Sequence, residues 1–457
     1  MTGNGILGLR RLADARAALN RGQVSSEALT EAALAAIEAP DGEGRRTALS
    51  VYRTQALAAA RGIDALRAAG VQLPPLAGLP ISIKDLFDVA GEPTRAGSTI
   101  LADAPPAAAD APAIANLRRL GAVIVAKTNM VEFAFSGVGI NPHYGTPLNP
   151  WDRATGRVPG GSSSGAAVSV TDGMALAAIG TDTGGSVRIP SALCGLTGFK
   201  PTTGRHPMAG VLPLSTTVDT LGPLAWSVDC CRTIDAALRG EMPPPAQPLP
   251  AAGLRLAVPQ AIVLDDLDDA VAGRFEQALL RLSAAGARIV ELPFREVEGL
   301  SAITSRGGFS AAESWAWHRE LIARGRDHYD PRVLFRIEGG AAITAADYID
   351  MHRIRAELRA VVDRVTRPFD ALVLPTTPIV APPVAPLLAN DQTFFRHNAL
   401  LLRNTNIGNL LDRPAVSLPI GEPDGPPVGL MVMGGSGEDA RILDVAEGIE
   451  QALALSF

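Results

Sequence analysis

The chain has 457 residues, of which 47% are hydrophobic, so it is long enough to bury an extensive core in one large domain or in two to three smaller ones. Its 41 basic and 47 acidic residues leave a net charge of −6, which predicts neither a nucleic-acid surface nor attraction to a membrane. No stretch of about 18 uncharged apolar residues appears in the sequence, so we expect no membrane span.

Residues 1–70 predict a helical layer, because they are rich in Ala, Leu, Arg and Glu at helical spacing. Ser25 and Ser26 precede the segment Glu27–Glu38 in the manner of N-caps, since a serine hydroxyl accepts a hydrogen bond from a free N–H group of the first turn. A second helix is expected from Thr54 to Ala69. We expect this layer to cover a sheet.

Beyond Pro80, short apolar strands alternate with helices, which predicts an α/β sheet layered between helices. The Pro-rich stretch Met242–Pro250 is expected to be a linker or a surface crossing between two halves of the chain. The expected strands are Ala122–Ala126, Met174–Ile179, Leu254–Val258, Arg288–Leu292, Ala371–Leu374 and Pro427–Met433. The expected helices of the second half are Asp268–Ala285, Ala311–Arg324, Ala345–Val365 and a closing helix after the last strand.

The cysteines and histidines of the sequence show no metal-binding pattern. Cys194, Cys230 and Cys231 lack the paired spacing of metal ligands, and the last two are sequence neighbours, which rarely form a disulfide. We therefore expect reduced thiols and a cytoplasmic protein. None of the six histidines lies in a recognisable catalytic context and the zinc motif HExxH is missing from the sequence, so we expect neither a metal nor a cofactor.

Two segments rich in glycine and serine, Pro159–Gly165 and Gly180–Pro190, are the first candidates for a functional site. Glycine adopts positive φ without steric cost, so such a backbone turns sharply and exposes N–H groups. In residues 183–186, successive N–H groups are able to converge on one oxygen, which is the requirement of an oxyanion hole. Ser186, at the end of this run, is the candidate nucleophile.

Lys84 is the candidate base, because a serine hydroxyl is a weak nucleophile until a neighbouring base takes its proton. A free lysine titrates at about 10.4, so acting as a base near neutral pH requires a pKa lowered by about three units, or roughly 4 kcal/mol. Lys84 follows the apolar run Gly78–Ile83, where burial would lower the pKa in this way.

The residues alone leave simpler interpretations open. A lysine after a strand is usually an exposed cap, and a Gly/Ser loop is usually a turn or a linker. Residues 161–165 also match the GxSxG motif of α/β-hydrolases, with Ser163 as the nucleophile, although residues 152–159 before it look like loop rather than strand. A phosphate-binding loop is a further alternative, but neither segment ends in the Gly-Lys-Ser/Thr that such a loop needs.

Between Gly78 and Gly204 the sequence resembles the amidase signature family. Weaker C-terminal matches are residues 406–408 and the segment from 414 to 429. The strings that carry the resemblance, in the family's order, are GLPISIKD, KTNMVEFAFSG, YGTPLNPW, PGGSSSGAAVS and GTDTGGSVRIPSALCGLTGFKPT.

The resemblance implies an α/β fold in which a mixed central β-sheet is sandwiched between layers of α-helices, in a single domain over residues 1–457. The implied parts of this domain are an N-terminal helical layer of residues 1–70, a catalytic core of residues 71–240, and a second half of residues 251–457 with a helical insertion and C-terminal strands.

The resemblance also implies a Ser-cisSer-Lys triad made of Lys84, Ser162 and Ser186, with a cis peptide bond between Gly161 and Ser162. Neutral Lys84 would draw a proton from Ser162, Ser162 would draw one from Ser186, and Ser186 would attack the amide carbonyl. The implied oxyanion donors are the N–H groups of Thr183, Gly184, Gly185 and Ser186. The implied supporting residues are Ser163, Asp182 and Arg188, and the implied substrate-binding residues are Met130, Ala134 and Ser136, together with Phe133, Phe135 and the segment after Ser305.

The activity implied by the resemblance is hydrolysis of the carbon–nitrogen bond of a small-molecule amide through an acyl-Ser186 intermediate, which releases a carboxylate and ammonia or an amine. The alternative is a glutaminase or amidotransferase A-type subunit that works in a complex with partner chains. Homodimers are common in the family, so a homodimer is among the expected states. The chain departs from the family's GGSSGGS string at Ser164 and Ala166, and Ser164 would be strained if its position requires positive φ.

Overall fold

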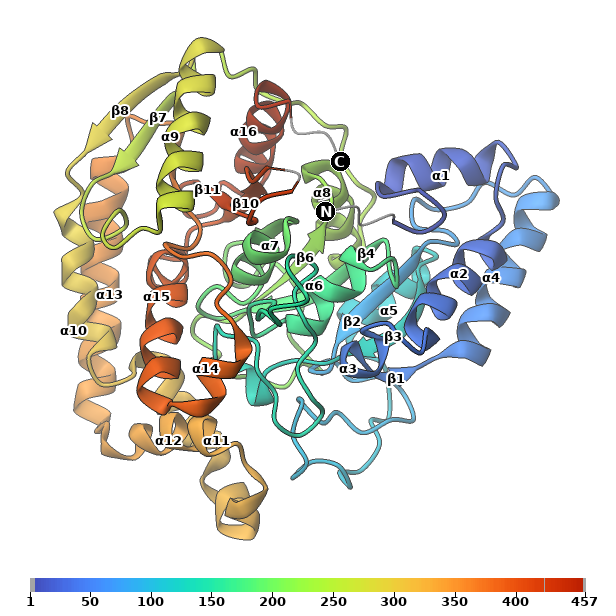
Figure 1. Ribbon diagram of the computed structural model, residues 1–457, viewed down its shortest axis with the longest axis horizontal. Helices are drawn as coiled ribbons and strands as arrows, with labels where there is room; N and C mark the ends of the chain where they lie inside the picture. Colours follow the sequence, from blue (N-terminus) through green and yellow to red (C-terminus); the bar gives the residue numbers. More distant parts are fainter. Residues whose placement is uncertain (1–4, 423, 455–457) are drawn as a thin grey trace.

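One eleven-stranded sheet runs through the computed structural model, which describes residues 5–422 and 424–454 (Figure 1). The strands lie side by side in the order β1-β3-β2-β4-β6-β5-β10-β11-β9-β7-β8. Their bounds are β1 (Ala48–Val51), β2 (Pro80–Lys84), β3 (Val123–Thr128), β4 (Ala177–Asp182), β5 (Thr197–Lys200), β6 (Thr220–Ala225), β7 (Arg255–Pro259), β8 (Arg288–Leu292), β9 (Ala371–Pro375), β10 (Ala415–Pro419) and β11 (Gly429–Met433).

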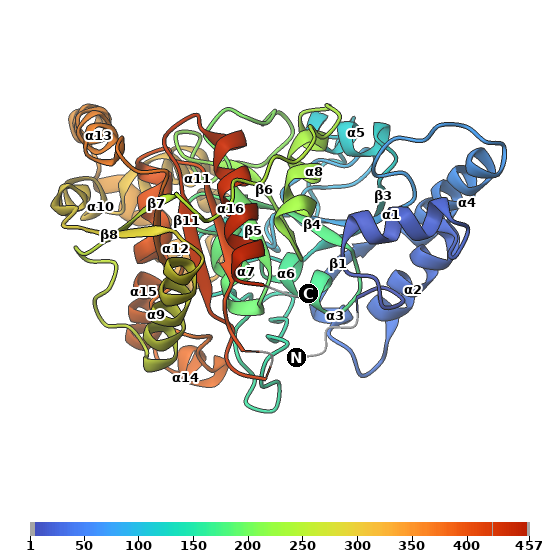
Figure 2. The same cartoon turned by 90° about the horizontal axis from the view of Figure 1, so that it is seen from above.

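Helices surround this sheet along its whole length (Figures 1 and 2). The α-helices are α1 (Leu12–Asn20), α2 (Ser26–Glu38), α3 (Gly44–Thr47), α4 (Arg53–Ala68), α5 (Pro112–Arg119), α6 (Ser164–Thr171), α7 (Arg188–Cys194), α8 (Val228–Leu238), α9 (Asp269–Ala284), α10 (Ser301–Thr304), α11 (Gly308–Gly325), α12 (Pro331–Glu338), α13 (Ala345–Thr366), α14 (Val384–Ala389), α15 (Asp391–Leu410) and α16 (Asp439–Ala452). The short 3₁₀ helices are η1 (Glu132–Ala134), η2 (Arg295–Leu300), η3 (Arg326–His328) and η4 (Gly339–Ala342).

The sheet is mixed, as the resemblance implied. Strand β2 runs parallel to both β3 and β4, and β7 runs parallel to both β8 and β9. The remaining neighbours, including β4 with β6 and β5 with β10, are antiparallel. The central strands β2, β3, β4, β5 and β6 are buried at every position, which fits strands covered by helices on both faces.

Two pairs of helices cover the middle of the sheet. Helices α6 and α7 pack against β4, β5 and β10, while α8 and α16 pack against β5, β6 and β10. Helices α2 and α4 pack together beside β3, which confirms the helical layer expected from residues 1–70 (Figure 1). Ser25 caps α2, because its hydroxyl accepts the Ala28 N–H at 3.0 Å.

Most of the expected elements are present with ends shifted by no more than three residues; the strand expected at Met174–Ile179, for example, begins only at Ala177. The N–H groups of Met174 and Ala175 both donate to the carbonyl of Ser169, so these residues form the turn that ends α6. Strands β5 and β6 were not expected, since glycine and proline interrupt their apolar residues.

The linker expected at Met242–Pro250 has no helix or strand and is mostly exposed. The three cysteines are free thiols, and burial raises the pKa of Cys230 to about 11. Among residues 5–422 and 424–454, none of the helices combines the length and apolar character needed to cross a bilayer.

Candidate active site

Lys84 is the last residue of β2, and its side chain is 0% exposed. Strand β2 runs parallel to β4, which ends at Asp182. Because the carboxyl ends of parallel neighbours lie at the same edge of a sheet, Lys84 is brought to the segment 183–186 that follows β4. The sheet therefore brings together two sequence regions about a hundred residues apart.

The Lys84 ammonium nitrogen lies 2.7 Å from Ser162 Oγ and 2.8 Å from Thr181 Oγ1. Burial lowers the pKa of Lys84 to about 7, although the negative charges of Asp182 and Asp219 oppose this change. A substantial fraction of Lys84 is therefore neutral near pH 7 and able to accept a proton. The sequence did not single out Thr181, whose hydroxyl gives Lys84 its second hydrogen-bond partner.

The peptide bond between Gly161 and Ser162 is cis, which confirms the expectation from the resemblance. The loop around it is fixed by two backbone hydrogen bonds, from Gly161 N–H to the Gly137 carbonyl at 2.8 Å and from Val131 N–H to the Ser162 carbonyl at 3.0 Å. A side chain at position 161 would lie 2.7 Å from the Gly139 nitrogen, so only glycine fits there. These contacts hold Ser162 in place beside Lys84.

Ser186 follows the glycine run and is 3% exposed. Its carbonyl accepts the Ser163 N–H at 3.3 Å, which joins the two serine segments. Among the described residues, no hydrogen bond links the hydroxyl groups of Ser162 and Ser186. The structure thus brings Lys84 and Ser162 into contact and places Ser186 beside them, with the last hydrogen bond of the expected relay not formed.

The backbone N–H groups of residues 183–186 have no acceptor anywhere in the part of the chain that the structure describes. Buried N–H groups are almost always paired, so four consecutive free donors next to Ser186 indicate a place for an anionic or carbonyl oxygen. Gly185 has a φ of 137°, a conformation that residues with a side chain rarely adopt. An oxyanion hole would need donors of this kind, and the sequence analysis expected them at residues 183–186.

Asp182 and Arg188 form a fully buried ion pair that shapes this loop. Arg188 donates to both carboxylate oxygens, at 3.0 and 2.9 Å, and the Val187 N–H donates to the same carboxylate at 3.2 Å. Burial alone would raise the pKa of Asp182, but the charge and hydrogen bonds of Arg188 bring it down to about 2. Asn409 completes the network by donating to Asp182 at 2.8 Å and accepting from Arg188 at 2.6 Å.

Asp219 is a buried acid that the sequence analysis missed. Its carboxylate accepts the Thr183 hydroxyl at 2.5 Å and the N–H groups of Leu214 and Ser215 at 3.0 Å each. Burial raises the pKa of Asp219 to about 6 despite these hydrogen bonds. The antiparallel pairing of Asp182 with Thr220 is what places Asp219 opposite Thr183, and that pairing was not predictable without β6.

A cavity of about 140 Å³ opens beside Ser186, and we call it the serine pocket. Ala134 and Ser136 line it, whereas Met130 does not. The Met130 side chain is fully buried in the core. The residues that line the serine pocket are Ala134, Phe135, Ser136, Thr183, Gly184, Ser186, Leu214, Thr304, Gly307, Ser310, Arg336, Leu402 and Asn406.

Neither of the two residues that depart from the family string has positive φ, although the buried Ser164 hydroxyl has no hydrogen-bond partner among the described residues. Ser164 is the first residue of α6 and is not among the described residues with positive φ. The positive φ in this loop belongs to Gly160, at 80°. Ser164 and Ala166 are both fully buried, and Ala166 packs in a small cluster with Val170 and Leu224. Position 164 is helical and does not require positive φ, so the condition under which Ser164 would be strained is not met.

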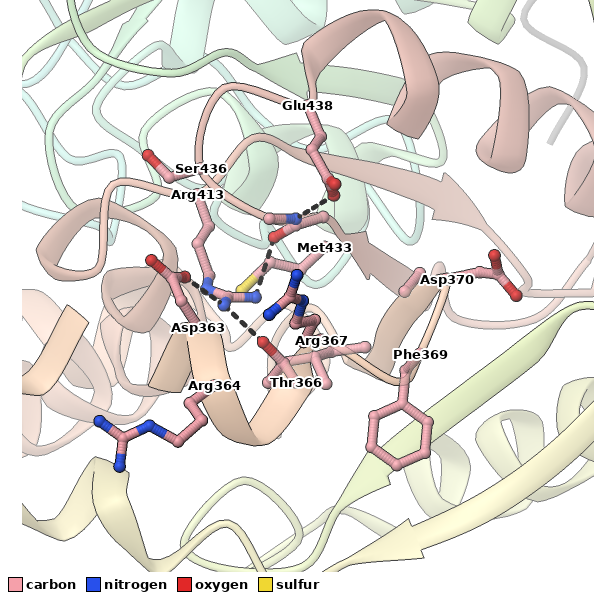
Figure 3. Close-up of a pocket in the computed structure, with 14 residues that line it drawn as sticks. Asp363, Arg364, Thr366, Arg367, Phe369, Asp370, Arg413, Met433, Ser436 and Glu438 are labelled. Atoms are coloured by element: carbon pink, nitrogen blue, oxygen red, sulfur yellow. Dashed lines mark hydrogen bonds and ion pairs between the residues drawn. The ribbon is translucent and has the colours of Figure 1, made fainter. Parts of the chain in front are cut away.

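A cavity of about 490 Å³ lies away from these residues, at the end of α13 and the start of α16 (Figure 3). At its centre the buried guanidinium group of Arg413 donates to Asp363 at 2.7 Å, to Thr366 at 2.6 Å and to the Gly434 carbonyl at 3.0 Å. Neither Lys84 nor either serine of the expected triad lines it. Its buried arginine is engaged by protein groups, so this cavity does not mark the chemistry.

Comparisons with known proteins find relatives over most of the chain. A family model described as Amidase matches residues 28–443. The 2-amino-5-chloromuconic acid deaminase of Comamonas testosteroni is 39% identical over 412 residues, which cover 88% of each chain. A glutamyl-tRNA(Gln) amidotransferase subunit of Chloroflexus aggregans is 34% identical and covers 96% of this chain and 95% of its own. A crystal structure of an amidase, 33% identical, superimposes with a TM-score of 0.86 over 96% of this chain and 99% of that chain.

Proposed function

The chain belongs to the amidase signature family and is a hydrolase of carbon–nitrogen amide bonds, and we propose that it cleaves its substrate through an acyl intermediate on Ser186. One observation above all supports this role: a fully buried lysine with a pKa of about 7 lies 2.7 Å from Ser162, beside the free N–H groups that flank Ser186. These groups supply a base, a relay hydroxyl and donors for an oxyanion.

In the proposed mechanism, neutral Lys84 accepts the Ser162 proton while Ser162 accepts the proton of Ser186, and Ser186 Oγ forms a bond to the amide carbonyl carbon. Because the two serine hydroxyls are not yet hydrogen-bonded, the Ser186 side chain turns toward Ser162 when substrate binds. The N–H groups of residues 183–186 hold the oxyanion. The proton then passes back through Ser162 to the amide nitrogen, the carbon–nitrogen bond breaks, and water hydrolyses the resulting ester.

Labelling with a serine-reactive fluorophosphonate tests the assignment of the nucleophile. Trypsin cleaves after Arg157 and Arg188, so Ser162, Ser163 and Ser186 fall on one peptide and fragmentation within it must locate the label. We expect the label on Ser186, its loss in Ser186→Ala, and slower labelling in Lys84→Ala. A label on Ser163 would instead favour the GxSxG interpretation. Ser164→Ala is the matched control, because it removes a serine of the same loop that neither interpretation makes the nucleophile.

We also propose that the substrate carries an anionic group, because Arg336 is the one charged residue that lines the serine pocket. Its guanidinium group donates to the Phe135 carbonyl and lies 4.2 Å from the centre of the Phe135 ring. Burial lowers the pKa of Arg336 to about 10, so it stays charged at neutral pH, yet no carboxylate of the described residues pairs with it. An unpaired guanidinium in a pocket favours a substrate carboxylate.

The residues that line the serine pocket also argue against a glutaminase subunit. Glutamine carries an ammonium group as well as a carboxylate, and none of the lining residues in the described chain is acidic. A glutamine ammonium group would therefore lie in the serine pocket unpaired, at a cost in binding free energy. The name of the deaminase from Comamonas testosteroni, by contrast, specifies an amino-substituted acid, which is consistent with the charge of Arg336.

Arg336→Met and Arg336→Lys test the substrate class. For an amide that carries a carboxylate, we expect kcat/KM to fall about a hundredfold in Arg336→Met, since a charged hydrogen bond contributes about 1.5–3 kcal/mol. The lysine variant should retain part of the activity. The methyl ester of the same amide is the control, and an equal loss with both compounds would refute the proposed contact.

We further propose a cytoplasmic location. The support is that Cys194, Cys230 and Cys231 are all buried free thiols, as expected in a reducing compartment. Quantifying the protein's thiols after purification from cells under acid-quenched conditions tests this, and fewer than three reduced thiols would argue against it.

A further inference from the structure

A second cavity, of about 330 Å³, adjoins the serine pocket, and we call it the side groove. The two cavities share three lining residues, Thr304, Leu402 and Asn406. Leu402 and Asn406 lie one turn apart on α15, so a single face of this helix separates the cavities. A group bound at Ser186 therefore lies in a pocket that shares these three lining residues with the side groove.

The floor of the side groove is apolar. Two charged residues line the groove, but neither is placed to bind a ligand there. Glu298 is exposed at the rim, and Arg403 donates to the Asp265 carbonyl at 2.6 Å. Apart from Ser301, Thr304 and Asn406, the other lining side chains are aliphatic, and the most buried of them are Val297, Leu300, Ile407 and Leu410. Such a surface favours a hydrocarbon group and disfavours a charged one.

The boundary between the cavities also contacts the free N–H groups near Ser186. A side chain on Gly184 would lie 3.3 Å from Leu402 Cδ2 and 3.4 Å from Asn406 Oδ1, so both residues face the glycine run. The Asn406 side-chain amide has no hydrogen-bond partner among the described residues. A carbonyl held at Ser186 therefore lies next to an unpaired amide and to the opening of an apolar groove.

We propose that the side groove binds an apolar part of the substrate, so that the preferred amides carry a carboxylate for Arg336 and a hydrocarbon group for the groove. The inference rests on the proposed function and names the substrate class of the same site. Asn406, at the passage between the two cavities, hydrogen-bonds the substrate amide and so sets the direction in which the hydrocarbon group leaves the serine pocket.

Ala399→Trp provides a test, because Ala399 is an exposed residue of α15 that lines the side groove and no part of the triad. The substrates are carboxylate-bearing amides with and without a phenyl substituent. In the unmodified protein we expect kcat/KM to be at least about tenfold higher for the phenyl compound, within the range that apolar pockets give. Ala399→Trp should abolish this preference and leave the smaller amide unaffected, while Gln392→Trp, outside the groove, should change neither.

Equal rates for the two amides in the unmodified protein would overturn the inference, as would an equal loss of both in Ala399→Trp. Fluorophosphonate labelling of Ser186 separates the two proposals. If Ser186 is labelled and the phenyl group gives no advantage, the side groove has no role in binding; if Ser186 is not labelled, the proposed function itself is wrong.

An independent observation concerns Thr405, which lies on α15 between Leu402 and Asn406. Its hydroxyl donates to the Gly184 carbonyl at 2.7 Å. This carbonyl and the Gly185 N–H belong to one planar trans peptide, in which the two groups point in opposite directions. The hydrogen bond therefore fixes the plane of that peptide and the direction of the Gly185 N–H, which has no acceptor among the described residues.

We infer that Thr405 is a positioning residue for the oxyanion donor at Gly185. Thr405→Val keeps the shape of the side chain and removes the hydroxyl, so we expect kcat to fall about ten- to a hundredfold with KM nearly unchanged. The affinity for an aldehyde analogue of the substrate, which forms a tetrahedral adduct, should fall by a similar factor. Thr405→Ser restores the hydroxyl and should recover most of the rate.

Thr377→Val is the matched control. The buried Thr377 hydroxyl donates to a backbone carbonyl, that of Ile379 at 3.0 Å, as the Thr405 hydroxyl does to Gly184 and, at 3.3 Å, to Leu402, but Thr377 lines neither cavity. Thr377→Val should leave kcat unchanged. The inference fails if Thr405→Ser loses as much activity as Thr405→Val, or if Thr405→Val lowers only the melting temperature while Ser186 keeps its reactivity toward the fluorophosphonate.

Discussion

Replacing Asp219 by asparagine is expected to move the acidic limb of the pH–rate profile to lower pH. The negative charge of Asp219 is one of two that raise the pKa of Lys84 against the effect of burial. Removing this charge lets the pKa of Lys84 fall further. Asp182, the other charge, is unsuitable for the test, because its removal leaves Arg188 buried and unpaired.

The magnitude follows from the burial of Lys84. A decrease of its pKa from 10.5 to about 7 corresponds to roughly 5 kcal/mol in favour of the neutral form. If neutral Lys84 is the base, kcat/KM at pH 5 should be about 1% of its plateau, and it should rise about tenfold per pH unit up to pH 7. In Asp219→Asn the same limb should lie at lower pH, even if the loss of an acceptor for Leu214 and Ser215 reduces the plateau.

The effect of Lys84 on stability has a definite sign. Its pKa is lower in the folded protein than in the unfolded chain, so between about pH 7 and 10.5 the unfolded chain binds the extra proton. The free energy of unfolding therefore increases as pH rises through this window. Below pH 7 the full penalty of burying the charged lysine is present, and the free energy of unfolding is lower. Lys84→Met should be more stable than the unmodified protein at pH 6, and this difference should shrink by pH 9.

The assay is kcat/KM from pH 5 to 9 on a carboxylate-bearing amide, with circular dichroism at each pH to verify folding. An acidic limb that stays in place in Asp219→Asn would refute the effect of the Asp219 charge on the pKa of Lys84. A limb that disappears in this variant would show that Asp219, with its own pKa of about 6, is the titrating group. Activity that keeps rising to pH 9 would mean that Lys84 has an ordinary lysine pKa.

Four further substitutions have clear expected outcomes. Ser186→Ala should lower kcat at least about a thousandfold in a steady-state assay without changing the melting temperature. Arg188→Met leaves Asp182 buried and unpaired, so urea titration should show a loss of about 3–5 kcal/mol in the free energy of unfolding. Met130→Ala should cost about 2–5 kcal/mol in the same titration with KM unchanged, because Met130 lies in the core. Ser164→Gly should cost about 0.5–1 kcal/mol and leave kcat within about twofold, since position 164 is helical and has no need of glycine.

The local features of the protein follow from short stretches of its sequence. The apolar run before Lys84 predicted a buried strand with a lysine at its end, and the glycines before Ser186 predicted a loop with exposed N–H groups, because both depend on residues adjacent in the chain. Ser25 capped its helix for the same reason. The resemblance added the cis bond at Gly161–Ser162, which spacing alone does not indicate.

The distant residues that complete the site, by contrast, are brought there by the tertiary fold. Asp219 lies opposite Thr183 because β4 pairs with β6, and Arg336, Thr405 and Asn409 come from the second half of the chain. None of these residues belongs to a local pattern, since an arginine or an asparagine on a helix is ordinarily exposed to solvent. The register of the sheet and the packing of α15 on the glycine run determine their roles, and both depend on the energy of the whole folded core rather than on neighbouring residues.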